Sequence, residues 1–110
     1  MSAAGYVPET GDIVWLDFSP QTGHEQAGRR PAFVLTPAIY NRHGLMLCCP
    51  MTTKRKGYPF EVVVEDGSIV LADQVKSVDW RKRNAQLKSR ASDAILKQVR
   101  AKAIKLIGGS

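Results

Sequence analysis

The sequence predicts a mainly β fold (β plus α) with one C-terminal helix, built as a small, partly open β-barrel or strongly bent sheet. Short β-rich segments bounded by turn residues follow one another through the first 80 residues. Apolar residues then recur at helical spacing near the C-terminus. A chain of 110 residues has to bury its apolar side chains in a single core, and so few residues favour a sheet that curls on itself.

Two strands are predicted in the first third of the chain. Residues 12–18 are β-rich and lie between short turn segments. Residues 31–36 form the next strand, and its leading Pro31 favours an edge position because proline has no N–H to donate. A polar loop, residues 21–30, separates the two strands. Residues 37–44 indicate a helical turn or a loop.

The middle of the chain predicts four more short strands. The apolar run at 45–49 is one of them. Residues 60–65 and 68–72 flank the dipeptide Asp66-Gly67, which is a strong local signal for a hairpin. Residues 75–80 add one further strand.

The chain closes with an amphipathic helix. Ser92 is a suitable N-cap, and Gly108 ends the periodic run. The apolar positions between them are Ile95, Leu96, Val99, Ala103, Leu106 and Ile107. The sequence contains no repeat, low-complexity segment or linker, so we treat residues 1–110 as one domain.

Several classes of protein are disfavoured by the composition. The chain has no apolar run near ~18 residues and no signal-peptide layout, so we expect no membrane span and a cytoplasmic location. Cys48 and Cys49 are adjacent, and neighbouring strand residues point to opposite faces, so they are interpreted as small buried residues without a disulfide. His24 and His43 are far apart, and no cofactor motif is present, so neither a metal site nor a cofactor is expected.

The positive charge is concentrated at the C-terminal end. Residues 1–80 contain seven Lys and Arg against nine Asp and Glu, whereas residues 81–110 contain nine against Asp93 alone. Such a region attracts phosphates or an acidic protein partner. The alternative interpretation is a solvated, lysine-rich helix face.

The loop at residues 23–31 is unusually rich in reactive side chains for a connector. It contains His24, Glu25, Arg29 and Arg30 within a few positions. Polar groups on a loop held by a rigid scaffold are often functional, although a salt-bridged surface loop has the same composition.

These residue types suit the cleavage of RNA, which carries its own nucleophile in the 2′-OH. Such cleavage requires a base for the 2′-OH proton, donors or a cation for the charge on the phosphorane, and an acid for the departing 5′-oxygen. Glu25 can act as the base, Arg30 can hold the charge, and the Thr52 hydroxyl can donate to a phosphate oxygen.

A series of motifs over residues 6–108 resembles the MazF/PemK family of bacterial toxins, and MazF most of all. The motifs are Gly11-Asp12-Ile13-Val14-Trp15, Gly23 to Pro31, Pro50-Met51-Thr52-Thr53, Lys56 to Val62, and Leu71 to Ser77. The resemblance implies an SH3-like barrel with a C-terminal helix and a homodimer. It also implies sequence-specific, metal-independent cleavage of single-stranded RNA, with a lean toward sites containing ACA, that arrests translation. The products would carry a 2′,3′-cyclic phosphate and a 5′-OH.

Carried over position by position, the catalytic residues of the family fall on Glu25, Arg30 and Thr52. The PemK/Kid branch uses an Arg where this chain has Leu71, so His24 and Asp73 are assigned to the neighbourhood of the site. Tyr58 is the best candidate for stacking on a base or for anchoring its loop, whereas the aromatic residues of the strands are interpreted as core. The full set predicted to contact RNA is His24, Gln26, Arg29, Thr53, Lys54, Lys56, Tyr58, Asp73, Gln74 and Lys76.

Two other functions are compatible with a small basic barrel. A CcdB-like toxin binds gyrase through a tryptophan on its last helix, whereas the last tryptophan here is Trp80. A non-catalytic RNA-binding barrel would need only the basic region.

The apolar stripe of the helix favours a homodimer. The resemblance implies an antitoxin with an acidic, disordered tail, which the basic C-terminal region would attract.

Overall fold

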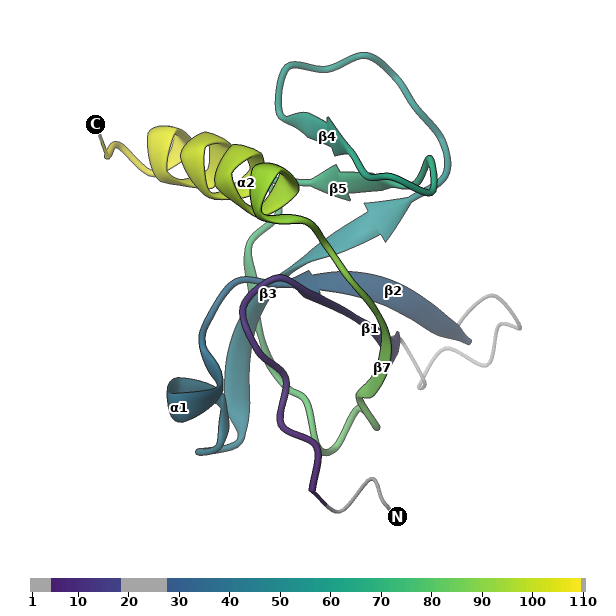
Figure 1. The fold of residues 1–110 in the computed structure, drawn as a ribbon, viewed down its shortest axis with the longest axis vertical. Helices are drawn as coiled ribbons and strands as arrows, with labels where there is room; N and C mark the ends of the chain where they lie inside the picture. The colour runs from purple at the N-terminus through teal and green to yellow at the C-terminus, as the bar shows by residue number, and fades with distance from the viewer. Residues whose placement is uncertain (1–4, 19–27, 110) are drawn as a thin grey trace.

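The computed structural model describes residues 5–18 and 28–109, and its main element is one antiparallel sheet (Figure 1). The strands are β1 (Asp12–Asp17), β2 (Arg29–Val34), β3 (Leu45–Thr52), β4 (Glu61–Val63), β5 (Ile69–Leu71), β6 (Lys76–Asp79) and β7 (Gln86–Arg90). The helices are α1 (Ala38–Asn41) and α2 (Asp93–Leu106). The predicted class, a curled β sheet with a C-terminal helix, is confirmed.

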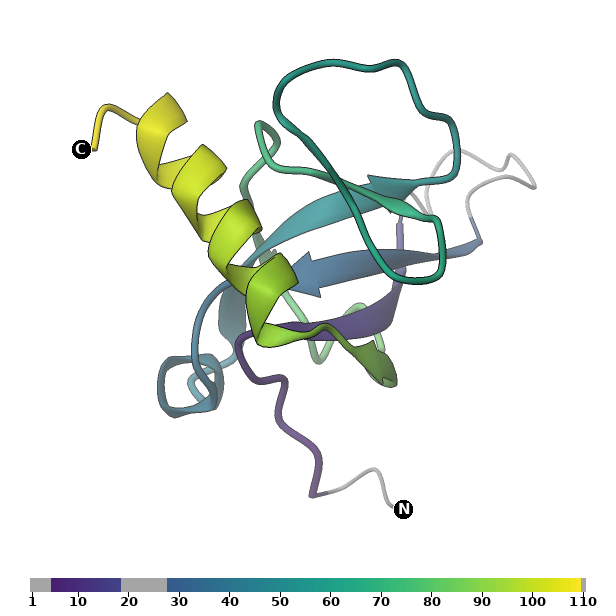
Figure 2. The same cartoon turned by 45° about the horizontal axis from the view of Figure 1, so that its top comes forward.

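The curvature of the sheet comes from β3. Strands follow the order β4-β5-β3-β2-β1-β7, and β6 also pairs with β3. The first part of β3 pairs with β6 and β2, so that Cys48 lies opposite both Lys76 and Val34. Its last part pairs with β5, with Met51 opposite Val70. The strand therefore bends out of one layer into another, as Figures 1 and 2 show, and α2 lies on the side of the β4-β5 hairpin.

Apolar side chains are buried on both faces of the sheet. One cluster lies between the sheet and α2 and consists of Ile13, Phe33, Cys49, Met51, Val62, Val64, Val70, Ala72, Ile95 and Val99. The other consists of Val14, Leu16, Ala32, Val34, Met46, Cys48, Val78 and Trp80. Successive residues of a strand point to opposite faces, so the unbroken apolar runs of this sequence supply both clusters.

The two cysteines illustrate this alternation and confirm the prediction of buried thiols. Cys48 belongs to one cluster and Cys49 to the other, and both are free. Burial raises the pKa of Cys48 to about 11 and that of Cys49 to about 12.

One prediction about the strands was wrong, and one strand was missed. β2 lies between β1 and β3 rather than at an edge. Pro31 is tolerated there because its pairing with β3 begins only at Ala32, one residue later. The sequence prediction also missed β7, whose five residues are all exposed, so that this strand shows no apolar alternation.

The helix predictions are confirmed at both ends of α2. The Ser92 hydroxyl accepts a hydrogen bond from the backbone N–H of Ile95 at 3.2 Å. Gly108 has a φ of +95°, which suits glycine after a helix. The apolar stripe packs on the sheet of its own chain through Ile95 and Val99. Within the described ranges, no helix is long and apolar enough to cross a membrane.

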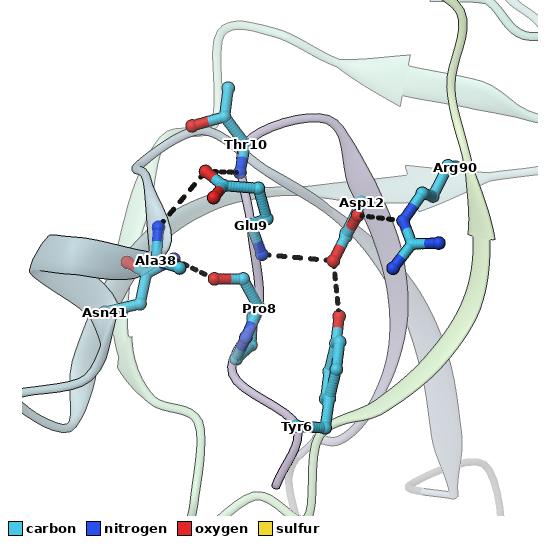
Figure 3. Close-up of polar contacts among 8 residues, drawn as sticks. All are labelled: Tyr6, Pro8, Glu9, Thr10, Asp12, Ala38, Asn41 and Arg90. Atoms are coloured by element: carbon cyan, nitrogen blue, oxygen red, sulfur yellow. Dashed lines mark hydrogen bonds and ion pairs between the residues drawn. The ribbon is translucent and has the colours of Figure 1, made fainter.

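A buried carboxylate fastens the segment before β1 to the sheet (Figure 3). Asp12 is 2% exposed. Its Oδ2 accepts from the Tyr6 hydroxyl at 2.7 Å and from the Glu9 N–H at 3.1 Å. Its Oδ1 accepts from Arg90 Nε on β7 at 3.1 Å. Burial and the neighbouring carboxylate raise the pKa of Tyr6.

Candidate functional site

A pocket opens at the end of β3, where the basic loop of residues 53–60 leaves the sheet. Its volume is about 240 Å³. The lining residues are Thr52, Lys54, Lys56, Tyr58, Phe60, Glu61, Leu71 and Gln74. Five of them, Thr52, Lys54, Lys56, Tyr58 and Gln74, belong to the predicted site, so the fold brings these together. Pockets for drug-sized ligands measure ~300–1,000 Å³, and this smaller one suits a group the size of a single nucleobase.

Thr52 lies at the inner edge of the pocket and is fixed by the sheet. It is the last residue of β3 and pairs with Ile69 of β5. Its Oγ1 accepts a hydrogen bond from the backbone N–H of Lys54 at 3.1 Å. The hydroxyl proton can therefore be donated to a ligand, because a hydroxyl accepts and donates at once.

Arg30 comes to the same end of the sheet from the neighbouring strand. The β2-β3 ladder pairs Phe33 with Cys49 and Ala32 with Pro50, and extending this register by two residues sets Arg30 against Thr52. Arg30 is exposed and lies opposite Leu16 of β1. The backbone of Arg30 therefore lies at the end of the sheet that holds the pocket, but its side chain does not line the pocket.

Arg29 is held by contacts within the sheet. Its guanidinium donates to Asp17 Oδ1 at 2.7 Å and to the Asn84 carbonyl at 2.6 Å. The Asn84 amide also donates to Asp17 Oδ2 at 2.7 Å, and this bond, followed by the Arg29 contact, lowers the pKa of Asp17. Arg29 therefore ties β1, β2 and the turn before β7 together. These contacts leave other N–H groups of its exposed guanidinium for RNA, so the predicted RNA contact stays a prediction.

The remaining predicted residues lie at different distances from the pocket. Thr53, Asp73 and Lys76 are exposed and do not line it. Lys76 belongs to β6 and pairs with Cys48, four residues before Thr52 along β3. His24, Glu25 and Gln26 lie outside the described residues.

Three pocket residues were missed by the sequence prediction of the site. Leu71 ends β5 and was noted only as a departure from the PemK branch. Phe60 was assigned to the core, but its ring stacks on Tyr58 with a centroid distance of 5.2 Å. Glu61 was read as an ordinary strand residue. A carboxylate five residues after a run of three cations was the available signal for it.

The cations of the loop form no ion pair with any residue that the structure describes. Lys54, Arg55 and Lys56 are all exposed. The ion pairs found among the described residues involve Arg29, Lys88 and Arg90 instead. Within the same part of the chain, no group of three His, Cys, Asp or Glu side chains is placed to hold a metal ion.

A comparison with protein families identifies the class. Residues 9–107 match the model of the PemK-like, MazF-like toxins of type II toxin–antitoxin systems. The chain belongs to this family.

Individual relatives narrow the similarity to MazF. The chain is 51% identical to the endoribonuclease toxin MazF of Escherichia coli strain K12 over 107 residues, which covers 94% of this chain and 96% of that protein. It is 34% identical to the endoribonuclease toxin ChpB of the same strain, over 82% of this chain and 85% of that one. A crystal structure of MazE-MazF from Deinococcus radiodurans superposes with a TM-score of 0.89 at 51% identity, covering 96% of this chain and 99% of the other.

Proposed function

We propose that the chain is a sequence-specific endoribonuclease that cleaves single-stranded RNA without a metal ion and thereby arrests translation. The observation that carries this proposal is the pocket at the end of β3, where a hydroxyl with a free proton, two lysines and an exposed aromatic ring converge beside Arg30. The relatives named endoribonuclease support it.

The chemistry follows from RNA itself. The 2′-oxygen attacks the adjacent phosphorus while a base, for which we propose Glu25, takes its proton. Arg30 and the Thr52 hydroxyl stabilise the additional negative charge of the phosphorane. The bond from phosphorus to the 5′-oxygen then breaks, and that oxygen takes up a proton. The products are a 2′,3′-cyclic phosphate and a 5′-hydroxyl.

One incubation separates this proposal from its alternatives. Purified protein is mixed with a long single-stranded RNA in EDTA, and the fragment ends are mapped. Discrete fragments with 5′-hydroxyl ends support the nuclease, whereas binding without fragments indicates a non-catalytic RNA-binding barrel. A gyrase-binding toxin is disfavoured because Trp80 is buried and its Nε1 donates to the Asn41 carbonyl at 2.6 Å.

The catalytic roles are tested by substitution. Glu25→Gln and Arg30→Ala should each lower kcat by about 10²-fold or more while the fold is retained. RNA with deoxyribose at the cleaved nucleotide should not be cut. Cleavage of that substrate would mean that water is the nucleophile and would reject the mechanism.

Two partners belong to the proposal as well. The first is a second copy of the chain, because Ile104, Leu106 and Ile107 stay exposed at the end of α2 after its stripe has packed on the sheet. Light scattering at micromolar concentration should give the mass of a dimer, and a monomer would contradict this.

The second partner is an antitoxin with an acidic, disordered tail, since the similar structure from Deinococcus radiodurans is of MazE-MazF. Such a tail would mimic RNA phosphates over the basic regions and compete with the substrate. Saturating uncleavable RNA should weaken binding of the tail in proportion to its concentration. A plateau at finite affinity would indicate two separate, coupled sites. A cytoplasmic location is proposed with these roles.

A further inference from the structure

The loop at residues 53–60 is held in shape by the carboxylate of Glu61. Glu61 Oε1 accepts from the backbone N–H of Gly57 at 3.0 Å and from that of Lys56 at 3.3 Å. Its Oε2 lies 3.2 Å from the same Lys56 nitrogen. Gly57 has a φ of +80°, in the left-handed region. Two successive N–H groups that converge on one anion form a nest, a backbone arrangement that favours negative charge.

Further contacts fix the second half of the same loop. The backbone N–H of Glu61 donates to the Tyr58 carbonyl at 3.1 Å. The Tyr58 ring stacks on Phe60 with an angle of 29° between the planes. From α2, the Lys102 ammonium donates to the Pro59 carbonyl. The segment is therefore tied both to β4 and to the C-terminal helix.

Without these contacts the loop would have little reason to keep one conformation. Lys54, Arg55 and Lys56 are adjacent like charges that repel one another, and the segment contains no apolar residue that is fully buried. Ordering such a segment at the moment of binding would lower affinity, whereas a loop that is ordered beforehand avoids this cost.

We propose that Glu61 is a positioning residue, which holds the loop of residues 53–60 so that Lys54, Lys56 and Tyr58 face the pocket beside Thr52. The inference rests on the proposed function, because the ligand received there is single-stranded RNA. Glu61 itself takes no part in the chemistry. Its carboxylate fills the nest and shapes the surface on which RNA binds.

Simple electrostatics predicts the opposite change in RNA affinity, so the direction of that change decides between the two explanations. A carboxylate at the edge of a phosphate-binding surface repels RNA, so neutralising it should strengthen binding. If Glu61 positions the loop, neutralising it weakens binding even though the net charge of the protein becomes more positive.

The variants are Glu61→Ala, Glu61→Gln and, as a control matched in charge, Asp93→Asn. Asp93 is exposed in the first turn of α2, outside the loop. Glu61→Gln keeps the shape and one acceptor oxygen, so it preserves the fold and part of the nest contact. Thermal unfolding establishes that each variant is folded.

Three measurements are made on the full chain. Amide hydrogen exchange of Lys56 and Gly57 by NMR reports the nest directly. Kd is measured for RNA with deoxyribose at the cleaved nucleotide, and KM and kcat are measured on the cleavable RNA.

We expect fast exchange at Lys56 and Gly57 in Glu61→Ala, with Kd and KM raised about tenfold and kcat within about threefold of wild type, the scale of one lost charge-assisted hydrogen bond. Glu61→Gln should fall between this variant and wild type, and Asp93→Asn should bind as tightly as wild type or more tightly.

Equal or tighter RNA binding by folded Glu61→Ala overturns the inference, as does unchanged exchange at both amides. A wild-type protein that cleaves no RNA rejects the proposed nuclease alone, since amide exchange and the Kd for unmodified RNA, which such a protein leaves intact, still decide the role of Glu61.

Discussion

Replacing the buried carboxylate of Asp12 should cost the protein a large part of its stability. In Asp12→Ala the Tyr6 hydroxyl and the Glu9 N–H both lose an ionised acceptor. Hydrogen bonds to charged groups contribute about 1.5–3 kcal/mol each, so the lower values for two of them give about 3 kcal/mol. The ion pair with Arg90 adds less than about 1 kcal/mol, because the Arg90 side chain is 69% exposed.

The expected fall in Tm is about 12 °C, at roughly 4 °C per kcal/mol for a chain of this size. Unfolding is followed by circular dichroism at one fixed protein concentration, because association changes the apparent Tm. Arg90→Ala is the matched control and should lower Tm by less than about 4 °C, since Asp12 keeps its other two donors. If Asp12→Ala lowers Tm no more than Arg90→Ala does, the two buried hydrogen bonds contribute little and the reasoning fails.

Three other outcomes are expected. Cys48 and Cys49 should react with a thiol reagent only after unfolding, because burial raises both pKa values far above neutral; rapid labelling of the native protein would contradict this. The folded-state pKa of Asp17 is lowered, so its contribution to stability is present above its unfolded pKa near 3.9 and is lost as the pH falls through the lower folded value. Asp17→Asn should flatten the acid limb of the unfolding curve, and an unchanged limb would speak against the contacts with Asn84 and Arg29. Thr52→Val should lower kcat by about tenfold or more while Thr52→Ser retains most of it, and equal rates would remove the hydroxyl from the proposed mechanism.

Much of the fold could be predicted because its signals are local. The Asp66-Gly67 turn and the Ser92 cap can each be recognised from a few neighbouring residues. The position of β2 within the sheet is not local, because Pro31 is compatible with an edge or with a central strand whose next ladder begins one residue later. β7 was missed because a strand with both faces exposed leaves no periodic pattern in the sequence.

The candidate site could be predicted only where the type of a residue indicates what that residue does. Thr52, Lys56 and Tyr58 belong to the family motifs of the sequence and line one pocket. Arg29 was predicted to contact RNA, and its contacts with Asp17 and Asn84 were not foreseen because these partners are distant in sequence. Glu61 was overlooked because its partners are the backbone N–H groups of Lys56 and Gly57. Nearly every residue carries such a group, so no residue type in the sequence marks them as partners.

The exposed β7 also bears on the aggregation of the protein. Among the described strands it pairs only with β1, so its other edge presents unpaired N–H and C=O groups. Such an edge is a template on which another chain can add a strand and begin to aggregate. Lys88 and Arg90 stand on this strand, and an incoming strand would have to accommodate both cations. Lys88 and Arg90 interrupt the apolar alternation that would have predicted β7. The same two charges therefore oppose the addition of a further strand at the edge of the sheet.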